Sequence, residues 1–210
     1  MTGGLPVSIA REAVAELPIR RYEGPVYLVA TAPDLARAMA DIRQERVVGI
    51  DTETRPAFRK GESYPPALVQ VATARVVYLF RLHQVDCAAA LAELLGAPSI
   101  VKAGVALADD LRQLKREFQF EPAAILDPGR IARRHGIRQT GLRNLAAIFL
   151  GFRITKGART SNWAAAHLTA AQIAYAATDA WACRELYLRF QTLGLLAEQQ
   201  KSVPPTTGNQ

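Results

Sequence analysis

The chain has 210 residues, of which 50% are hydrophobic, so it can bury the core of one compact domain and is not disordered over most of its length. No apolar run approaches the roughly 18 residues that span a bilayer, and the first residues lack the pattern of a secretory signal, so we expect no membrane attachment. The formal net charge is +7 and 21 of the 26 basic residues are arginine, which favours an anionic partner, although a genomic bias toward arginine and alanine gives the same excess.

The chain contains two cysteines, Cys87 and Cys183, and no cysteine or histidine cluster with the spacing of a zinc site. Each cysteine lies in an alanine-rich helical pattern, which predicts two small buried core residues. Free thiols fit a reducing compartment, and we expect the protein to be cytoplasmic.

The chain divides into three segments. Residues 1–24 are a lead-in with one short helical pattern near residues 10–17, residues 25–195 form one domain, and residues 196–210 are predicted to be a disordered tail. No internal repeat and no interdomain linker interrupts the domain.

The first half of the domain is rich in strand patterns. A strand at 25–29 precedes a helix that we expect Thr31 to cap, with Asp34 reaching back toward it. Three further strands lie at 47–53, 68–72 and 76–80, with a polar loop at 55–66. Their short connections predict an antiparallel meander.

The second half alternates strands with helices and then becomes mainly helical. The predicted elements, in order, are a helix capped by Asp86 that runs to 95, a strand at 99–105, a helix at 110–118, a short strand at 125–127, a helical turn at 131–135, a helix from Thr140 to 150, a loop at 152–168, and a long helix that opens with a capping box at 169–172 and ends near 193. Strands and helices in this order predict an α/β three-layer architecture with a mixed sheet.

Asp51 and Glu53 stand two residues apart at the end of an apolar strand, so both side chains point to the same face of the sheet. Burying two unpaired carboxylates is costly, and the pair therefore needs a cation, a hydrogen-bond network or solvent. Such a pair is common at strand ends, and a solvated strand terminus is the alternative interpretation.

Asp110 follows the strand that contains Gly104, at the start of the next predicted helix. An aspartate at this position most often caps the helix, and the adjacent Asp109 can fill the same role. Spacing alone leaves open which of the two is the candidate metal ligand.

Tyr175 and Asp179 are four residues apart on the long helix and share one of its faces. Alanines surround them, which allows the helix to lie close to the sheet and leaves room for ligands. The alternative interpretation is a packing aromatic beside a solvated acid.

In this order, the three motifs resemble those of the DEDDy family of 3′–5′ exonucleases, which includes ribonuclease D and the Werner-syndrome exonuclease domain. The family's Asp-x-Glu strand matches Asp51 and Glu53, its second motif matches Asp110, and its Tyr-x-x-x-Asp motif matches Tyr175 and Asp179. The resemblance extends over roughly residues 25 to 193 and favours Asp110 over its neighbour.

The resemblance implies a ribonuclease-H-like α/β/α fold and hydrolysis of phosphodiester bonds at nucleic-acid 3′ ends with two divalent cations, Mg²⁺ or Mn²⁺. Asp51 would bridge both ions, while Glu53 and Asp179 would hold the ion that activates water. Asp110 would position the second ion through water, and Tyr175 would hydrogen-bond the attacking water. The expected products are nucleoside 5′-monophosphates.

Four further residues are candidate contacts to a single strand or a duplex 3′ end, of DNA or RNA. Lys156, Arg159 and Trp163 lie in the loop before the last helix, and Arg55 follows the first motif. Trp163 has a structural anchor as its alternative role, and Arg55 a place in a solvated loop.

Two other functions fit the sequence less well. A catalytically silent nucleic-acid-binding or scaffold protein on the same fold is disfavoured because all five motif residues are present. A doubly wound nucleotide-binding protein is disfavoured because no glycine-rich phosphate loop follows a strand.

Overall fold

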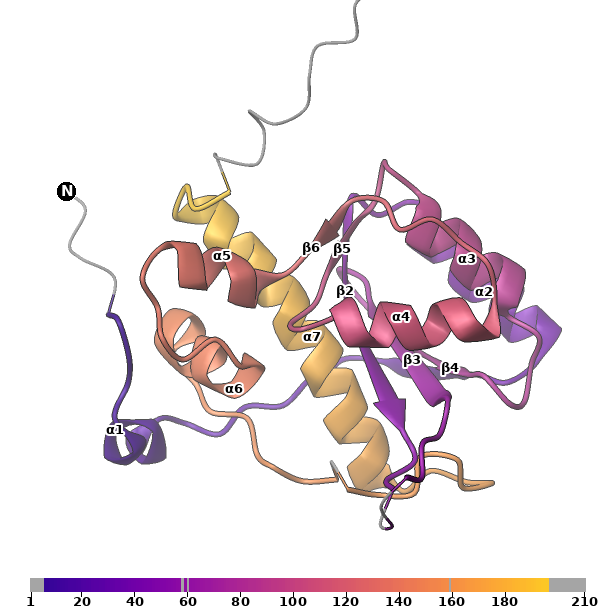
Figure 1. Cartoon of the computed structure of the whole chain (residues 1–210), viewed down its shortest axis with the longest axis horizontal. Coiled ribbons are helices and arrows are strands. Elements are labelled where there is room, and N and C mark those ends of the chain that lie inside the picture. The colour runs from indigo at the N-terminus through magenta and orange to yellow at the C-terminus, as the bar shows by residue number, and fades with distance from the viewer. Residues whose placement is uncertain (1–5, 58, 60, 159, 197–210) are drawn as a thin grey trace, which may run out of the picture.

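The computed structural model describes residues 6–57, 59, 61–158 and 160–196, and a six-stranded sheet forms its centre (Figure 1). The strand order is β1-β4-β3-β2-β5-β6. The strands are β1 Val26–Val29, β2 Val47–Thr54, β3 Pro66–Ala72, β4 Val77–Arg81, β5 Val101–Ala103 and β6 Ile125–Leu126.

Seven α-helices and one π-helical segment belong to the described part of the chain. They are α1 Arg11–Glu16, α2 Ala32–Ile42, α3 Ala88–Gly96, α4 Ala108–Glu117, α5 Pro128–Arg134, α6 Leu142–Leu145, the π-helical η1 Ala146–Leu150 and α7 Ala170–Thr192. Within the described residues, no helix combines the length and apolar character needed to cross a membrane.

The sheet is mixed, as the sequence predicts. β2, β3 and β4 form the antiparallel meander, whereas β1 pairs with β4, β5 with β2 and β6 with β5 in parallel. β5 pairs only with the first part of β2, from Val47 to Gly49. The second part of β2 therefore has β3 on one side and no β5 partner on the other, which leaves space beside the two acidic residues.

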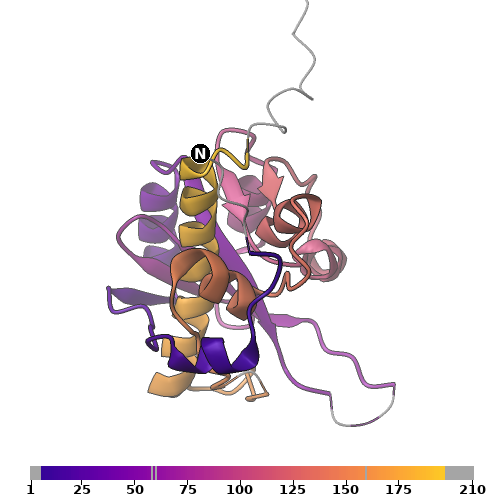
Figure 2. The ribbon, with the colours of Figure 1, turned by 90° about the vertical axis from the view of Figure 1, so that its left-hand side faces the viewer.

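Helices cover both faces of the sheet and complete the predicted three layers (Figures 1 and 2). Met39 of α2, Leu94 of α3 and Leu114 of α4 share one buried cluster with Val48 and other strand residues. The opposite face is covered mainly by α7, which contacts β2, β3, β4 and β5, and α5, α6 and η1 pack beside it. The connection between β2 and β3 projects from the body of the molecule (Figure 2).

Two predicted helix starts are confirmed by their capping interactions. Thr31 accepts a hydrogen bond from the Asp34 amide at 3.3 Å and donates one to the Asp34 carboxylate at 2.6 Å. Thr169 and Gln172 form the reciprocal capping box that opens α7. These interactions satisfy amide groups that the first turn of a helix leaves unpaired.

Other predicted caps are wrong. Leu107, without a side-chain cap, precedes α4, so neither acidic residue of its first turn caps the helix. Gly141 precedes α6, and Thr140 does not cap it. Asp127 instead caps α5 by accepting hydrogen bonds from the amides of Gly129 and Arg130 at 2.7 and 3.3 Å, although the sequence placed it in a strand.

The lead-in is attached to the domain by backbone contacts. Ile19 forms an isolated bridge with Arg153, and the Tyr22 amide donates to Thr178 of α7 at 3.0 Å. The division of the chain at residue 24 stays a prediction. The predicted disordered tail lies, from residue 197 on, outside the described residues. Both cysteines are free and buried, as predicted.

Gly49 sets the distance between α7 and the sheet. A Cβ atom added there would overlap the carbonyl oxygen of Ala180 and lie 2.8 Å from the backbone nitrogen of Arg184. Both are backbone atoms of α7, so the clash can be relieved only if the helix moves. Glycine is thus required by close approach rather than by a turn.

We expect Gly49→Ala to lower the free energy of unfolding by about 1–3 kcal/mol, because overpacking forces α7 away from β2. Thermal or urea unfolding measures the change. Gly96→Ala is the matched control, since a Cβ there makes an ordinary contact with the Glu121 carbonyl and alanine favours a helix. Equal stability of the two variants would contradict the proposed close approach.

Candidate active site

The first two acidic side chains leave β2 where the strand emerges from the core. β2 is fully buried from Val47 to Ile50 and half-buried from Asp51 onward. Because side chains alternate along a strand, Asp51 and Glu53 share the face on which Gly49 meets α7. The strand therefore directs two carboxylates toward the long helix.

α7 brings the third carboxylate to the same place. Ala176, Ala177 and Ala180 are fully buried, and these small side chains let the helix lie close to the sheet. Asp179, itself almost fully buried, then reaches Asp51 and Glu53, and one carboxylate oxygen from each of the three lies within 4.8 Å of the others. Two segments about 130 residues apart in the sequence thus form one cluster of oxygen ligands.

The cluster is electrostatically strained without a cation. Burial, followed by the charges of Asp179, Glu53 and Asp110, raises the pKa of the Asp51 carboxyl well above its usual range. Burial also raises the pKa of Asp179 to about 6, although hydrogen bonding to Tyr175 and the positive charge of Arg143 act in the opposite direction. A bound divalent cation would remove this repulsion, and carboxylate oxygens are ligands that hard cations prefer. The donor set therefore fits a metal ion.

Asp110 lies beside this triad on α4. The Thr52 hydroxyl donates a hydrogen bond to its carboxylate at 2.6 Å, and burial raises the pKa of Asp110. Its charge reaches Asp51, although its oxygens are not among the three that lie within 4.8 Å of one another. The neighbouring Asp109 is largely exposed and forms an ion pair with Arg112. Of the two adjacent acids, Asp110 is the one that the structure brings to the site.

Tyr175 lies one helical turn before Asp179 and is close to the same acids. Burial and the charges of Asp179 and Glu53 raise the pKa of Tyr175 well above its ordinary value of 10. The phenol therefore keeps its proton at neutral pH and acts as a hydrogen-bond donor, not as a base. Its ring packs at 6.0 Å from the ring of Trp163.

The four predicted nucleic-acid contacts differ in their surroundings. Trp163 is fully buried, so the structure favours its anchor role under α7 over a contact with a strand. Lys156 and Arg55 are exposed, and the Arg55 guanidinium lies 4.6 Å from the centre of the Tyr64 ring. Arg159 lies outside the described residues.

A cavity of about 850 Å³ adjoins Tyr175. Residues 18–24 and the loop that carries Lys156 form its walls together with α7. Thr155 and Gly157 of this loop therefore border the same hollow as Tyr175, and Lys156 lies between them in the sequence.

Three residues of the site were missed by sequence reasoning. Thr52 stands between the two acids of β2, but its contact with α4 depends on packing. Gln70 is fully buried and pairs in register with Asp51, and its side-chain amide has no hydrogen-bond partner among the described residues; a polar residue in an apolar strand is the signal that could have found it. Arg143 has a buried guanidinium nitrogen and acts on Asp179, yet nothing in its sequence surroundings marks it.

The comparisons with known proteins agree with this geometry. The family model described as 3′-5′ exonuclease matches residues 26–194. Ribonuclease D of Gluconacetobacter diazotrophicus is 37% identical over 170 residues, which cover 79% of this chain and 42% of that protein. The mouse bifunctional 3′-5′ exonuclease/ATP-dependent helicase WRN is 29% identical over 192 residues, covering 87% of this chain and 14% of that protein. The chain thus spans less than half of the length of these relatives.

Solved structures share the fold. The EXO domain of Aedes aegypti Nibbler has a TM-score of 0.74 at 24% identity, covering 86% of this chain and 93% of that one. Escherichia coli RNase D has a TM-score of 0.70 at 22% identity, covering 84% of this chain and 49% of that one. The predicted ribonuclease-H-like α/β fold is confirmed by these neighbours and by the mixed sheet.

The raised pKa values predict how pH acts on the metal-free protein. An acid whose pKa is higher in the folded than in the unfolded state favours folding only while it is protonated. Because the pKa of Asp179 is raised to about 6, the free energy of unfolding of the metal-free protein should fall as pH rises between about 4 and 7. Asp51→Asn removes part of the repulsion. In a chelator, we expect the melting temperature of this variant to exceed that of the wild type increasingly from pH 5 to pH 8.

Excess Mg²⁺ at pH 8 should raise the melting temperature of the wild type and leave that of Asp51→Asn unchanged. Differential scanning calorimetry with and without the cation measures both effects. A variant that gains no stability over the wild type in chelator at any pH would argue against the repulsion.

Proposed function

The chain belongs to the 3′–5′ exonuclease family, and from this premise we propose that it hydrolyses phosphodiester bonds at the 3′ end of a nucleic acid and releases nucleoside 5′-monophosphates. The observation that carries the proposal is the convergence of Asp51, Glu53 and Asp179 within 4.8 Å at the junction of β2 and α7. Asp110 and Tyr175 at the edge of the same cluster support it.

We assign the cofactor as two divalent cations, Mg²⁺ or Mn²⁺. All four acidic side chains offer oxygen, and no thiolate or imidazole belongs to the carboxylate cluster among the described residues, which suits hard cations. When bound, such ions increase the acidity of a water nucleophile and stabilise the charge that develops on the phosphate and the leaving oxygen.

The side chains of this chain have separate roles in the proposed reaction. Asp51, central in the cluster, would be shared by both cations, while Glu53 and Asp179 would complete the site of the first. Asp110 would serve the second cation, and its hydrogen bond from Thr52 holds it in one orientation. Tyr175, which stays protonated, would orient the attacking water by a hydrogen bond.

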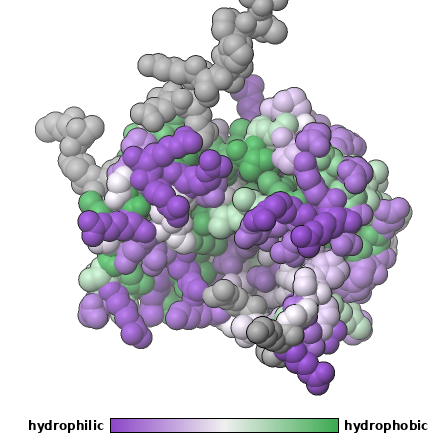
Figure 3. All heavy atoms as spheres, in the orientation of Figure 1, coloured by the Kyte–Doolittle hydropathy of each residue, from purple (hydrophilic) through white to green (hydrophobic). Residues whose placement is uncertain are grey.

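The substrate is proposed to reach this site along a basic surface. Lys156, in the loop before α7, and Arg55, directly after β2, are exposed and can contact phosphates. Figure 3 shows hydrophilic side chains over α4 and α5, where Arg112, Arg130 and Arg133 are exposed. A single strand or a duplex 3′ end, of DNA or RNA, fits this arrangement. A cytoplasmic location stays a prediction that the two free cysteines favour.

We expect Asp51→Asn and Asp179→Asn to lower the rate of hydrolysis by more than roughly 100-fold, because each removes a charged ligand of the cation. The assay follows a 5′-labelled oligonucleotide with Mg²⁺ or Mn²⁺, with and without a chelator. Wild-type protein should give metal-dependent shortening from the 3′ end.

Asp109→Asn is the matched control. This residue is adjacent to Asp110 but is exposed and paired with Arg112, so its loss should leave the rate unchanged. Full activity of either cluster variant would overturn the proposed function. Binding without shortening by the wild type would instead identify a silent nucleic-acid-binding protein.

Tyr175→Phe should reduce the rate constant of hydrolysis about 10- to 100-fold while metal binding is retained, because the lost phenol orients water and hydrogen-bonds Asp179 but is not itself a ligand. Single-turnover kinetics and calorimetric titration with the cation separate the two effects. Tyr27→Phe, at an exposed position of strand β1, is the control. An unchanged rate in Tyr175→Phe would contradict the orienting role.

A further inference from the structure

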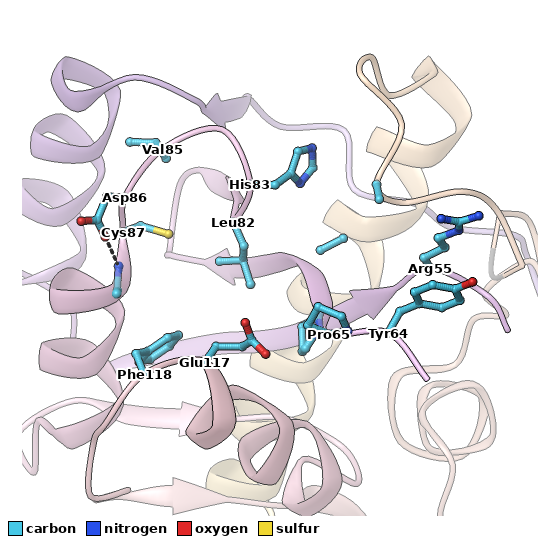
Figure 4. A pocket seen from close by; sticks show the side chains of 14 residues that line it. Arg55, Tyr64, Pro65, Leu82, His83, Val85, Asp86, Cys87, Glu117 and Phe118 are labelled. Atoms are coloured by element: carbon cyan, nitrogen blue, oxygen red, sulfur yellow. Dashed lines mark hydrogen bonds between the residues drawn. The ribbon is translucent and has the colours of Figure 1, made fainter. Parts of the chain in front are cut away.

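A second cavity lies on the opposite side of the sheet from α7, close to the ends of β3 and β4 (Figure 4). Its volume of about 410 Å³ falls within the roughly 300–1,000 Å³ of small-ligand sites. Residues from the β2–β3 connection, from the segment after β4 and from the end of α4 form its walls. No residue of the metal-binding cluster lines it.

The two ends of the cavity differ in chemistry. At one end Arg55 stacks on Tyr64, with 4.6 Å between the guanidinium carbon and the ring centre (Figure 4). At the other end Leu82 and Phe118 form apolar walls beside Cys87, and burial raises the pKa of this thiol to about 11, so it is uncharged at neutral pH. The cavity thus offers a flat aromatic surface at one end and an apolar wall at the other.

Away from the end where Arg55 lies, the charges of the lining disfavour a phosphate in this cavity. Asp86 and Glu117 both line it, and their negative charges would repel a phosphate group. Asp86 accepts a hydrogen bond from the Ala88 amide at 3.2 Å. Among the described residues, none hydrogen-bonds the Glu117 carboxylate, which Figure 4 shows directed between Leu82 and Pro65. The cavity therefore suits a flat, neutral group that carries N–H donors.

The cavity is connected to the candidate active site along two elements. Arg55 follows Glu53 by two residues, at the end of β2. Glu117 follows Asp110 by seven residues on α4, which corresponds to roughly 10 Å at 1.5 Å per residue. At about 3.4 Å per nucleotide of a stacked strand, this distance is about three nucleotides.

We propose that this cavity binds a nucleobase of the single-stranded substrate about three nucleotides upstream of the scissile phosphate, with Tyr64 as stacking surface and Glu117 as acceptor for the amino group of the base. This inference rests on the proposed exonuclease function and adds a specificity site to it. Adenine, cytosine and guanine carry amino groups, whereas thymine and uracil present carbonyl oxygens to the carboxylate. The site should therefore favour the amino-bearing bases.

The test measures equilibrium binding of labelled oligonucleotides by fluorescence anisotropy, in chelator, with Asp51→Asn as the parent protein so that no hydrolysis occurs. A single abasic nucleotide is moved from the first to the sixth position from the 3′ end, in DNA and in RNA. We expect a loss of affinity of roughly fivefold or more at one upstream position, since stacking of one base contributes this much or more.

That loss should disappear when Tyr64→Ala or Glu117→Gln is added to the parent, while the losses at other positions remain. With intact strands, replacing cytosine by uracil or thymine at the sensitive position should weaken binding to the parent, and Glu117→Gln should abolish this preference. Glu121→Gln, an exposed acid paired with Lys115 outside the cavity, is the matched control.

An abasic profile that is identical in the parent and in both cavity variants would overturn the inference. Metal-dependent shortening by the wild-type protein is measured separately, so the exonuclease proposal can stand when the base site fails. Circular dichroism of each variant verifies that it is folded, and Glu117→Gln, exposed and nearly isosteric, keeps the test valid if Tyr64→Ala unfolds.

Discussion

The close approach of α7 to β2 is the constraint on which the site depends. Gly49 and Ala180 allow two backbones to meet where any larger side chain would separate them. This contact places Asp179 over the face of the sheet that carries Asp51 and Glu53. The remaining helices secure it, because α5, α6 and η1 pack against the far half of α7.

The same contact creates repulsion between carboxylates that the fold offsets only in part. Burial and neighbouring charges hold the pKa of Asp51 high. Burial also raises the pKa of Asp179, and among the described residues Tyr175 and Arg143 act to lower it. A cation is the simplest partner for such a cluster. The carboxylate repulsion lowers the stability of the metal-free protein, and the same carboxylates give the site its affinity for the ion. Metal binding therefore explains why three acidic residues occur together at this partly buried place.

Local chemistry determines the regular parts of this fold, so the sequence predicts the meander and the caps at Thr31 and Thr169. It also predicts that residues two apart on a strand, or four apart on a helix, share one face, as the site residues of β2 and α7 do. Thr140 was wrong as a cap because a glycine can precede a helix equally well, and Asp127 was missed because a strand residue and a cap share the same local pattern. The contacts of Thr52, Gln70 and Arg143 with the site arise from packing between distant segments, which no local pattern contains.

Anomalous diffraction from crystals soaked in Mn²⁺ would locate the cations that the carboxylates hold. We expect an anomalous peak within coordination distance of carboxylate oxygens of Asp51, Glu53 and Asp179, and a second peak toward Asp110 when a nucleotide is also bound. A saturating soak above pH 7 that leaves no peak between the three carboxylates would contradict the assignment of this cluster as a metal site.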